Sequence, residues 1–280
     1  MNDVVVITGG GSGLGLACAY ELGKAGYTIL ISGTNEEKLR LAKLELETKG
    51  IKCAYAKCDV SKKSEVDDLV KYSRSLGEIW AIVNAVGVAP PRIKSEKAII
   101  DVNAIGTFNI SEAFYKKMKN GGAIINIASI CAYEIPRLLR PKHVYRLVES
   151  NLEKCEKKML QLSRIFGRKQ SANIAYAISK CFVIYYSKKI AKRFYEENGI
   201  RVLSISPSNF LTEMGKADMK ERPGSVETYL RRQAIEKSGD PADLAFLVKC
   251  LIDERMKLLT ASDIHLDGGW HGYNKGKVRW

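Results

Sequence analysis

Residues 4–15 of the chain are Val-Val-Val-Ile-Thr-Gly-Gly-Gly-Ser-Gly-Leu-Gly, and they carry the clearest structural signal in the sequence. The run 4–7 is apolar and β-branched, which is typical of a strand buried on both faces. Residues 8–15 predict a glycine-rich turn, and residues 16–25 predict a helix. A strand, a glycine-rich turn and a helix in this order offer a helix N-terminus on which a pyrophosphate can rest.

The glycines follow the spacing Gly-x-x-x-Gly-x-Gly. Glycine is needed where the backbone turns sharply or approaches phosphates closely. A plain tight turn is the alternative interpretation, but the strand before the loop and the helix after it favour nucleotide binding. The candidate binding residues of the loop are Thr8, Gly9, Gly11, Ser12, Gly13, Leu14 and Gly15.

Strand and helix patterns alternate through the rest of the chain. Strands are predicted at 27–31, 51–57, 79–83, 123–128, 201–205 and 263–266, and helices at 35–49, 66–76, 102–119, 176–198 and 242–253. Such alternation implies an α/β fold, a doubly wound, Rossmann-type parallel sheet with helices on both faces. We expect residues 1–280 to form one domain, with ligands at the carboxyl ends of the strands.

The composition narrows the class of protein. Of 280 residues, 46% are hydrophobic and 27% charged, which is ordinary for a globular chain. Neither a run of 18 apolar residues nor a signal-peptide pattern is present, so we expect no membrane association. Seven scattered cysteines without a Cys-x-x-Cys motif favour reduced thiols in a cytoplasmic protein. The three histidines, His143, His265 and His271, show no metal-ligand spacing, so no metal site is predicted.

The net charge of +14 would suit nucleic acid, a membrane surface or anionic small molecules. Residues 137–170 carry ten Lys/Arg and three Glu, which is +7 and half of that charge. Apolar residues spaced three and four apart predict an amphipathic helix there. They are Val144, Leu147, Val148, Leu152, Cys155, Met159, Leu162 and Phe166. No aromatic-basic platform accompanies them, so nucleic acid is not expected as a partner.

Tyr176 and Lys180 are four residues apart on a predicted helix and therefore share one face. A tyrosine, with an unperturbed pKa of about 10, becomes a proton donor and acceptor for an alcohol/ketone pair when an ammonium favours its phenolate. Ser129 closes the predicted strand 123–128, where a hydroxyl can hold a substrate oxygen. Each signal alone has a structural explanation, and their order after the glycine loop favours catalysis.

These residues resemble the short-chain dehydrogenase/reductase family of the compact, single-domain type. The resemblance spans nearly the whole chain. It includes the loop 8–15, Asp59-Val60, Asn84-Ala85-Val86-Gly87, Asn103, Ser129, Tyr176, Lys180, residues 207–212, Gly239-Asp240-Pro241 and Asp267-Gly268-Gly269.

The resemblance implies hydride transfer between a nicotinamide and an alcohol or carbonyl carbon. Tyr176 would be the acid/base, Lys180 would lower its pKa and bind the nicotinamide ribose, Ser129 would orient the substrate oxygen, and Asn103 would support a water relay. Further cofactor-binding residues would be Gly33, Thr34, Asp59, Val60, Asn84, Ala85, Gly87, Pro207, Asn209 and Thr212. By the same resemblance, Asp59 and Val60 would lie beside the adenine, and Thr212 would bind the nicotinamide carboxamide.

The residue at the end of the second predicted strand bears on coenzyme choice. Selection of NAD(H) uses an acidic residue at this position to bind the ribose hydroxyls. Here the position is Gly33, followed by Thr34, and no carboxylate repels a 2′-phosphate. No Arg or Lys is adjacent either. We therefore favour NADP(H), with NAD(H) as the alternative.

Forty-six residues separate Ser129 from Tyr176, and the segment from Val86 to Asn103 is short. Both features resemble the bacterial 3α-hydroxysteroid dehydrogenase/carbonyl reductase subgroup. The best prediction is therefore a hydroxysteroid or bile acid as small-molecule substrate, with the insertion 137–170 beside the cleft. Its apolar stripe would line the substrate pocket, and its basic face would attract the anionic tail of a bile acid. The alternatives are a carbonyl reductase of other ketones, including fatty-acyl ones, and a nicotinamide-binding protein without turnover. The insertion could instead be a packed structural helix or an oligomer contact.

A homo-oligomer is expected, because the family's usual partner surface includes the helix after Tyr176. Residues 182–186 of that helix are apolar nearly all round, which suits burial between subunits. The aromatic and basic tail 270–280 could fold over the site or reach a neighbouring subunit, or be a frayed end.

Overall fold

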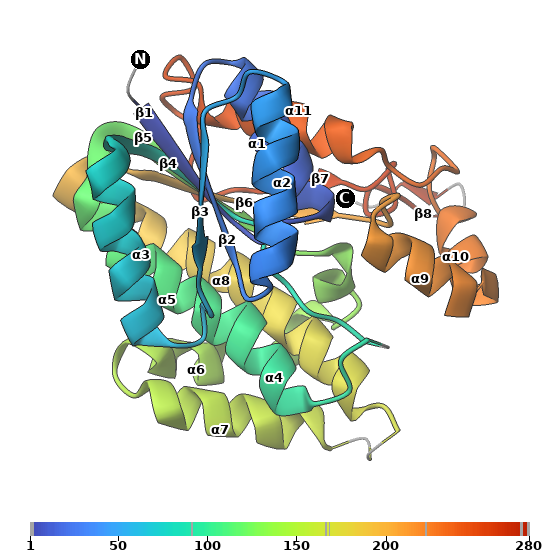
Figure 1. Cartoon of the computed structure of the whole chain (residues 1–280). Coiled ribbons are helices and arrows are strands. Elements are labelled where there is room, and N and C mark those ends of the chain that lie inside the picture. Colours follow the sequence, from blue (N-terminus) through green and yellow to red (C-terminus); the bar gives the residue numbers. More distant parts are fainter. Residues whose placement is uncertain are drawn as a thin grey trace.

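A seven-stranded parallel sheet forms the centre of the computed structural model, which describes residues 3–90, 92–165, 167, 169–221, 223–274 and 277–278. The strand order is β3-β2-β1-β4-β5-β6-β7 (Figure 1). The strands are β1 (Asp3–Thr8), β2 (Thr28–Gly33), β3 (Cys53–Lys57), β4 (Glu78–Asn84), β5 (Met118–Ile127), β6 (Arg201–Pro207) and β7 (Asp263–Leu266). The predicted doubly wound α/β fold is confirmed. The order reverses between β1 and β4, and ligands of such sheets bind at the strand ends beside the reversal.

Helices cover both faces of the sheet. One face carries α1 (Gly13–Lys24), α2 (Glu36–Thr48) and α11 (Pro241–Ile252), and the other carries α3 (Lys63–Leu76), α4 (Glu96–Ile100), α5 (Gly106–Phe114) and α8 (Ser171–Asn198). Val4 and Val6 of β1 pack into one apolar layer, and Val5 and Ile7 pack into the other. All four are fully buried, which explains why the run is apolar at every position.

Two stretches differ from the prediction. The helix expected over 102–119 is a π-helical turn (Asp101–Ile105), then α5, then a 3-10 turn, and β5 begins already at Met118. Three helices were not predicted, the short α4 and the pair α9 (Glu213–Glu221) and α10 (Pro223–Leu230). The segment of α9 is largely polar and exposed, so it lacks the apolar periodicity from which a helix is predicted.

The basic insertion is helical but broken into pieces. It forms α6 (Lys142–Tyr145), a 3-10 turn (Arg146–Glu149) and α7 (Leu152–Ser163), instead of one amphipathic helix. The Asn151 side chain caps α7 by accepting a hydrogen bond from the Lys154 N–H, so the helix restarts there. In Figure 1 the two helices lie outside α4, α5 and α8 as an added layer.

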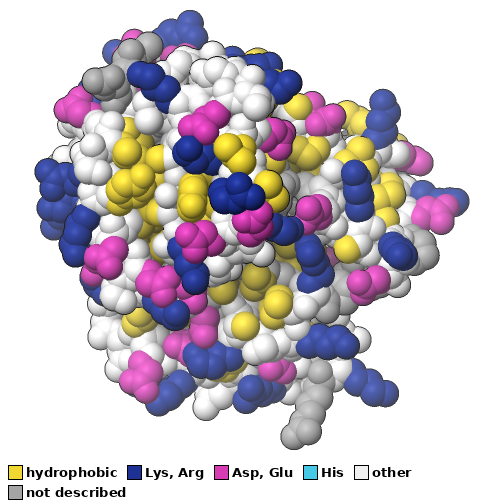
Figure 2. Space-filling model, in the orientation of Figure 1, with side chains coloured by type: hydrophobic (Ala, Val, Ile, Leu, Met, Phe, Trp, Pro, Cys, Tyr) yellow, Lys and Arg dark blue, Asp and Glu magenta, His cyan; other side chains and the backbone are white. Residues whose placement is uncertain are grey.

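The predicted apolar stripe of the insertion points into the core. Val144, Val148, Cys155 and Met159 are buried, whereas Phe166 lies outside the described residues. On the face seen in Figure 2, Lys and Arg side chains lie among Asp and Glu and form no continuous basic patch. The insertion is thus packed on the domain through its apolar side.

Tyr145 ties the insertion to α8. Its hydroxyl donates a hydrogen bond to the Ile178 carbonyl at 2.8 Å, and its ring meets Phe182 edge-on at 5.5 Å between centroids. The apolar side chains of 182–184 and of Tyr186 are buried within the chain, and Tyr185 is half-buried. These residues need no partner subunit to cover them, which corrects the argument for an oligomer from this helix. A homo-oligomer remains a prediction without an assigned surface.

The tail is partly described. Trp270 is buried and its ring stacks on Tyr229 of α10 at 5.2 Å, and the short strands β8 (Tyr273–Asn274) and β9 (Lys277–Val278) pair beyond it. Residues 275, 276, 279 and 280 lie outside the described part of the chain.

The seven cysteines form no disulfide. Within the described residues, no helix is both long enough and apolar enough to cross a membrane.

Candidate active site

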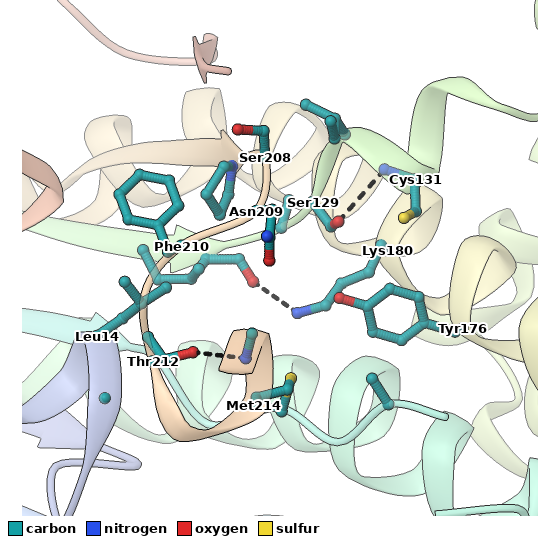
Figure 3. Close-up of a pocket in the computed structure, with 18 of the residues that line it drawn as sticks. Leu14, Ser129, Cys131, Tyr176, Lys180, Ser208, Asn209, Phe210, Thr212 and Met214 are labelled. Carbon is teal, nitrogen blue, oxygen red and sulfur yellow. Dashed lines mark hydrogen bonds between the residues drawn. The ribbon is translucent and has the colours of Figure 1, made fainter. Parts of the chain in front are cut away.

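A cavity of about 640 Å³ opens at the carboxyl ends of the central strands. Its wall brings together residues from the glycine loop, the ends of β4, β5 and β6, and helix α8 (Figure 3). The predicted residues that line it are Gly9, Ser12, Gly13, Leu14, Gly15, Ala85, Gly87, Ser129, Tyr176, Lys180, Pro207, Asn209 and Thr212. Gly9, Ser129 and Thr212, which are far apart in the sequence, therefore lie at one site.

The glycine loop packs too tightly for side chains. A Cβ on Gly15 would lie 2.3 Å from the Gly9 carbonyl oxygen, and Gly9 itself has a φ of +70°. Ser12, at the N-cap of α1, makes no side-chain cap hydrogen bond, so the first amides of the helix are not satisfied by it. Amides at a helix N-terminus that face a cavity suit a bound anion. The loop therefore fits the pyrophosphate of a dinucleotide.

Thr8 and Asn84 are placed behind this wall and do not line the cavity. The Thr8 hydroxyl donates to Asn84 Oδ1 at 2.7 Å, and the Asn84 amide reaches Thr107 and Asn126. Thr8 Oγ1 also accepts a hydrogen bond from the Val86 N–H. These buried side chains hold the strand ends and the 85–87 loop together, which is a supporting position rather than a binding one.

Lys180 is the buried cation of the site, with 4% of its surface exposed. Its Nζ donates to the Ile127 carbonyl oxygen at 2.8 Å and lies 5.9 Å from the centre of the Tyr176 ring. Burial lowers the pKa of Lys180 to about 8. Figure 3 shows Lys180 and Tyr176 side by side, with Ser129 above them. Three of the four predicted catalytic side chains therefore lie on one wall of the cavity.

Ser129 is buried at the end of β5, where the backbone leaves the sheet in an extended conformation. Its Oγ accepts a hydrogen bond from the Cys131 N–H at 3.3 Å. With its oxygen engaged as acceptor, the hydroxyl retains its proton for donation into the cavity.

Asn103 sits in the π-helical turn, and its side chain does not line the cavity. Oδ1 accepts from the Val88 N–H, and Nδ2 donates to the Val88 carbonyl and to Ser179 Oγ. The amide is therefore occupied in joining the 86–88 loop to α8. This arrangement gives Asn103 a positioning role beside the site rather than direct contact with a ligand.

The wall opposite Tyr176 comes from the segment after β6. Thr212 Oγ1 accepts from the Gly215 N–H at 3.1 Å and so caps α9, and its methyl group lies near Gly13. The Asn209 amide donates to Ser238. This segment therefore closes over the glycine loop, where the predicted contact of Thr212 with a carboxamide would be made.

The end of the sheet assigned to the adenosine lies outside the cavity. Gly11, Gly33, Thr34, Asp59 and Val60 are absent from its lining. No acidic side chain stands at the end of β2, because that position is Gly33.

A cation that the sequence analysis missed lies beside this end of the sheet. A Cβ on Gly11 would come within 3.6 Å of the Lys38 backbone, and Lys38 Nζ forms an ion pair with Glu213 at 2.8 Å. Lys38 is four residues beyond Thr34, and its N–H is held by the Asn35 cap, so the turn of α2 brings it back over the loop.

The rest of the lining comes from segments that the sequence did not single out. They are Ala89, Pro90 and Arg92 after β4, Ile130, Cys131 and Glu134 after β5, and Glu213, Met214, Gly215, Val226 and Tyr229 of α9 and α10. Glu134 and Tyr229 adjoin there: burial raises the pKa of Tyr229, and the neighbouring Cys131 and Glu134 raise it further. Glu134 follows β5 without any motif spacing, so the sequence gives no signal that its carboxylate lines the cavity.

None of the described residues between 137 and 169 lines the cavity, although Gln170 and Asn173 just beyond them do. The hypothesis that the apolar stripe lines a substrate pocket therefore fails for these residues, because their side chains are buried in the core. The alternative interpretation, a helical segment packed on the domain, agrees with the structure.

The turn after Ser129 is anchored by a buried carboxylate. The Tyr133 hydroxyl donates to Asp263 Oδ2 at 2.6 Å, and Ser204 and Ser206 donate to the same side chain. Burial alone would raise the pKa of Asp263, but the His265 imidazole 3.4 Å away and the hydroxyls of Ser204, Tyr133 and Ser206 hold it below its usual value. The polar end of β7 thus fixes the loop that carries Ser129.

Comparison with known proteins agrees with this geometry. Residues 3–138 match the family model described as short chain dehydrogenase, and residues 142–271 match the model described as enoyl-(acyl carrier protein) reductase. Among curated relatives, a 3-oxoacyl-[acyl-carrier-protein] reductase of Staphylococcus epidermidis is 24% identical, covering 97% of this chain and all of the relative.

A 3beta-hydroxysteroid dehydrogenase 2 of Eggerthella lenta is 26% identical, covering 97% of this chain and 96% of its own length. The crystal structure of a short chain dehydrogenase from Burkholderia cenocepacia in complex with NADP shares the fold, with a TM-score of 0.76 at 20% identity, over 97% of this chain and 98% of the other. The predicted family is confirmed: this chain belongs to the short-chain dehydrogenase/reductase family of NAD(P)-dependent oxidoreductases.

Proposed function

We propose that the protein interconverts a secondary alcohol and a ketone with NADP(H), using Tyr176 as the acid/base. The observation that carries this proposal is the meeting of Tyr176, Lys180 and Ser129 in the same cavity as the glycine loop. The nicotinamide supplies or accepts the hydride when bound. The chain's own residues hold the substrate oxygen and move its proton.

The proton is exchanged at the Tyr176 hydroxyl. In its ammonium form, Lys180 stabilises the phenolate, and its low pKa means that this ammonium is partly discharged above neutral pH. The Ser129 proton, free of the Cys131 contact, is donated to the substrate oxygen. Asn103 keeps the 86–88 loop against α8, which maintains the floor of the cavity.

The coenzyme assignment to NADP(H) rests on Gly33. NAD(H) selection needs a carboxylate at the end of β2, and glycine supplies none. The unsatisfied N-terminal amides of α1 and the close-packed glycines fit either coenzyme equally. The discrimination must therefore come from groups around the ribose.

The substrate is proposed to be an uncharged, largely apolar ketone or alcohol of the hydroxysteroid type. Ala89, Pro90, Ile130, Met214 and Val226 give the cavity an apolar wall. Glu134 beside Tyr229 would pair with a hydroxyl at the far end of the substrate and repel a carboxylate. This disfavours the anionic tail of a bile acid, which was expected to meet the basic insertion.

The Eggerthella relative, named for a hydroxysteroid activity, agrees with this class, and the Staphylococcus relative supports a 3-oxoacyl thioester as the second candidate. The test is an absorbance assay at 340 nm with NADP⁺ and NAD⁺ against neutral hydroxysteroids, bile acids and simple alcohols. NADPH with steroid ketones and 3-oxoacyl thioesters covers the reverse direction.

We expect turnover with neutral steroids, stronger with NADP(H). Turnover only with acyl thioesters would replace the substrate class and leave the chemistry intact. A purified, folded protein that binds coenzyme and turns over no alcohol or ketone would overturn the proposed function.

A further inference from the structure

The ion pair between Lys38 and Glu213 bridges the two sides of the coenzyme cleft. Lys38 belongs to the first turns of α2, on the glycine-loop side, and Glu213 begins α9 on the opposite side and lines the cavity. Their atoms Nζ and Oε2 are 2.8 Å apart, although the residues are 175 positions apart in sequence. No other part of the site described above uses this pair.

Lys38 belongs to the turn of α2 that packs against the end of β2, where sheets of this kind bind the adenosine ribose. The Lys38 backbone lies 3.6 Å from a Cβ built on Gly11 of the loop. The side chain of the next residue, Leu39, lies 3.8 Å from a Cβ built on Gly33. The position of the ribose-binding carboxylate in NAD(H)-selective sheets therefore faces the same turn of α2.

The pair is weak enough to be exchanged. The Lys38 side chain is 46% exposed and that of Glu213 is 59% exposed, and an ion pair in such a position contributes at most about fivefold to an equilibrium. A phosphate monoester carries a charge of about −1.5 to −2, so it attracts a lysine more strongly than one carboxylate does.

The carboxylate released by such an exchange keeps a cationic neighbour. Hydrogen bonding by Lys38 lowers the pKa of Glu213, and the charge of Arg92 lowers it further. Arg92 also lines the cavity, on the segment after β4. Glu213 can therefore leave Lys38 without becoming an isolated charge.

We propose that Lys38 binds the 2′-phosphate of NADP(H), and that it does so by exchanging Glu213 for the phosphate. This inference rests on the proposed coenzyme site and names the residue that selects the coenzyme there. Glu213 is then a competitor for Lys38 in the free protein, and the two residues have opposite effects on NADP(H) binding.

The test is a fluorescence titration of the full chain with NADPH and NADH, without substrate, together with displacement by 2′,5′-ADP and 5′-AMP. Lys38→Ala should weaken NADPH binding by about tenfold or more and change NADH binding by less than about twofold. Glu213→Gln should strengthen NADPH binding by up to about fivefold. Both side chains are exposed, so the fold tolerates these changes.

Arg40→Ala is the matched control, because Arg40 lies on the same helix but pairs with Glu37 within it. It should leave the NADPH/NADH ratio unchanged. The exchanged pair Lys38→Glu with Glu213→Lys restores an ion pair and should still lose the preference for NADPH.

Equal weakening of both coenzymes by Lys38→Ala and Glu213→Gln, with rescue in the exchanged pair, would show a merely structural ion pair and overturn the inference. So would loss of the NADPH preference in Lys57→Ala instead, since Lys57 is the neighbour of Gly33 on β3. Failure of the wild-type protein to bind either coenzyme would contradict the proposed function itself.

Discussion

The two walls of the cavity are built from different materials. The coenzyme wall is mostly main chain: glycines at the end of β1 and amides at the start of α1, fixed by the sheet behind them. The wall that would meet the substrate is made of side chains on the turn after Ser129 and on α9 and α10. A wall of backbone groups binds the same coenzyme whichever substrate the enzyme uses. A wall of side chains can change its substrate specificity through single substitutions. The insertion belongs to neither wall.

Tyr176 lies where the two walls meet, and its substitution should have the largest effect. In Tyr176→Phe the ring remains and the proton donor is lost, so kcat should fall by about 10³-fold or more. Coenzyme affinity should stay within about twofold of wild type. Steady-state kinetics together with a coenzyme titration measure both, and a kcat within tenfold of wild type would remove Tyr176 from the mechanism.

Lys180→Met should separate activity from stability. We expect kcat to fall by about 10²-fold, because the phenolate loses its ammonium. Yet the fold should become more stable near pH 7 by about 1–2 kcal/mol, since a buried ammonium with a depressed pKa costs folding free energy.

The free energy of unfolding should depend on pH in a direction set by the lowered pKa of Lys180. Between pH 8 and 10.5 the unfolded chain binds more protons at Lys180 than the folded chain, so this residue makes wild-type stability rise with pH there. Urea unfolding at pH 7 and pH 10 should show the advantage of the Met variant shrinking at the higher pH. An advantage that grows with pH would contradict the burial of a charged Lys180.

Met159→Ala tests the position of the insertion outside both walls. Met159 of α7 is fully buried on the side of the helix that packs on the domain, so the truncation should lower the free energy of unfolding by about 2–4 kcal/mol. KM and kcat measured well below the melting temperature should remain within about twofold of wild type. A selective rise in KM for one substrate would return the insertion to the substrate site. The exposed Lys157→Ala is a control that should change neither quantity.

Glu134→Gln should have the smallest effect and should depend on the substrate. Removing the carboxylate should raise kcat/KM for carboxylate-bearing substrates relative to neutral ones by about five- to tenfold. Coenzyme affinity should not move. Equal changes for neutral and anionic substrates would show that Glu134 does not face the bound substrate.

The coenzyme wall could be predicted from the sequence because its signals are local. The predicted strand, turn and helix follow one another within residues 4–25, and Tyr176 and Lys180 are joined by one helix turn. The substrate wall could not, since Glu134 and Tyr229 meet only through the packing of segments 95 positions apart. Lys38 was missed for a similar reason. A basic residue was sought next to Gly33 in the sequence, whereas the turn of α2 that carries Lys38 lies beside Gly33 only in the folded chain.

Some predicted residues have supporting positions rather than contact positions. Thr8, Asn84 and Asn103 match family motifs, but their side chains satisfy one another or nearby backbone groups. A motif in one sequence does not distinguish a residue that touches a ligand from one that holds the loop touching it. The insertion shows the same limit, because its apolar stripe was compatible with a pocket and with a core, and the core buries it.

The most direct test of the account is transfer of deuterium from NADPH labelled at C4 to a neutral steroid ketone, followed by mass spectrometry of the alcohol product. The account predicts a product one mass unit heavier with wild-type protein, and almost none with Tyr176→Phe under conditions where both proteins hold the coenzyme. Equal label transfer by the two proteins would contradict a site in which Tyr176 provides the proton for hydride transfer.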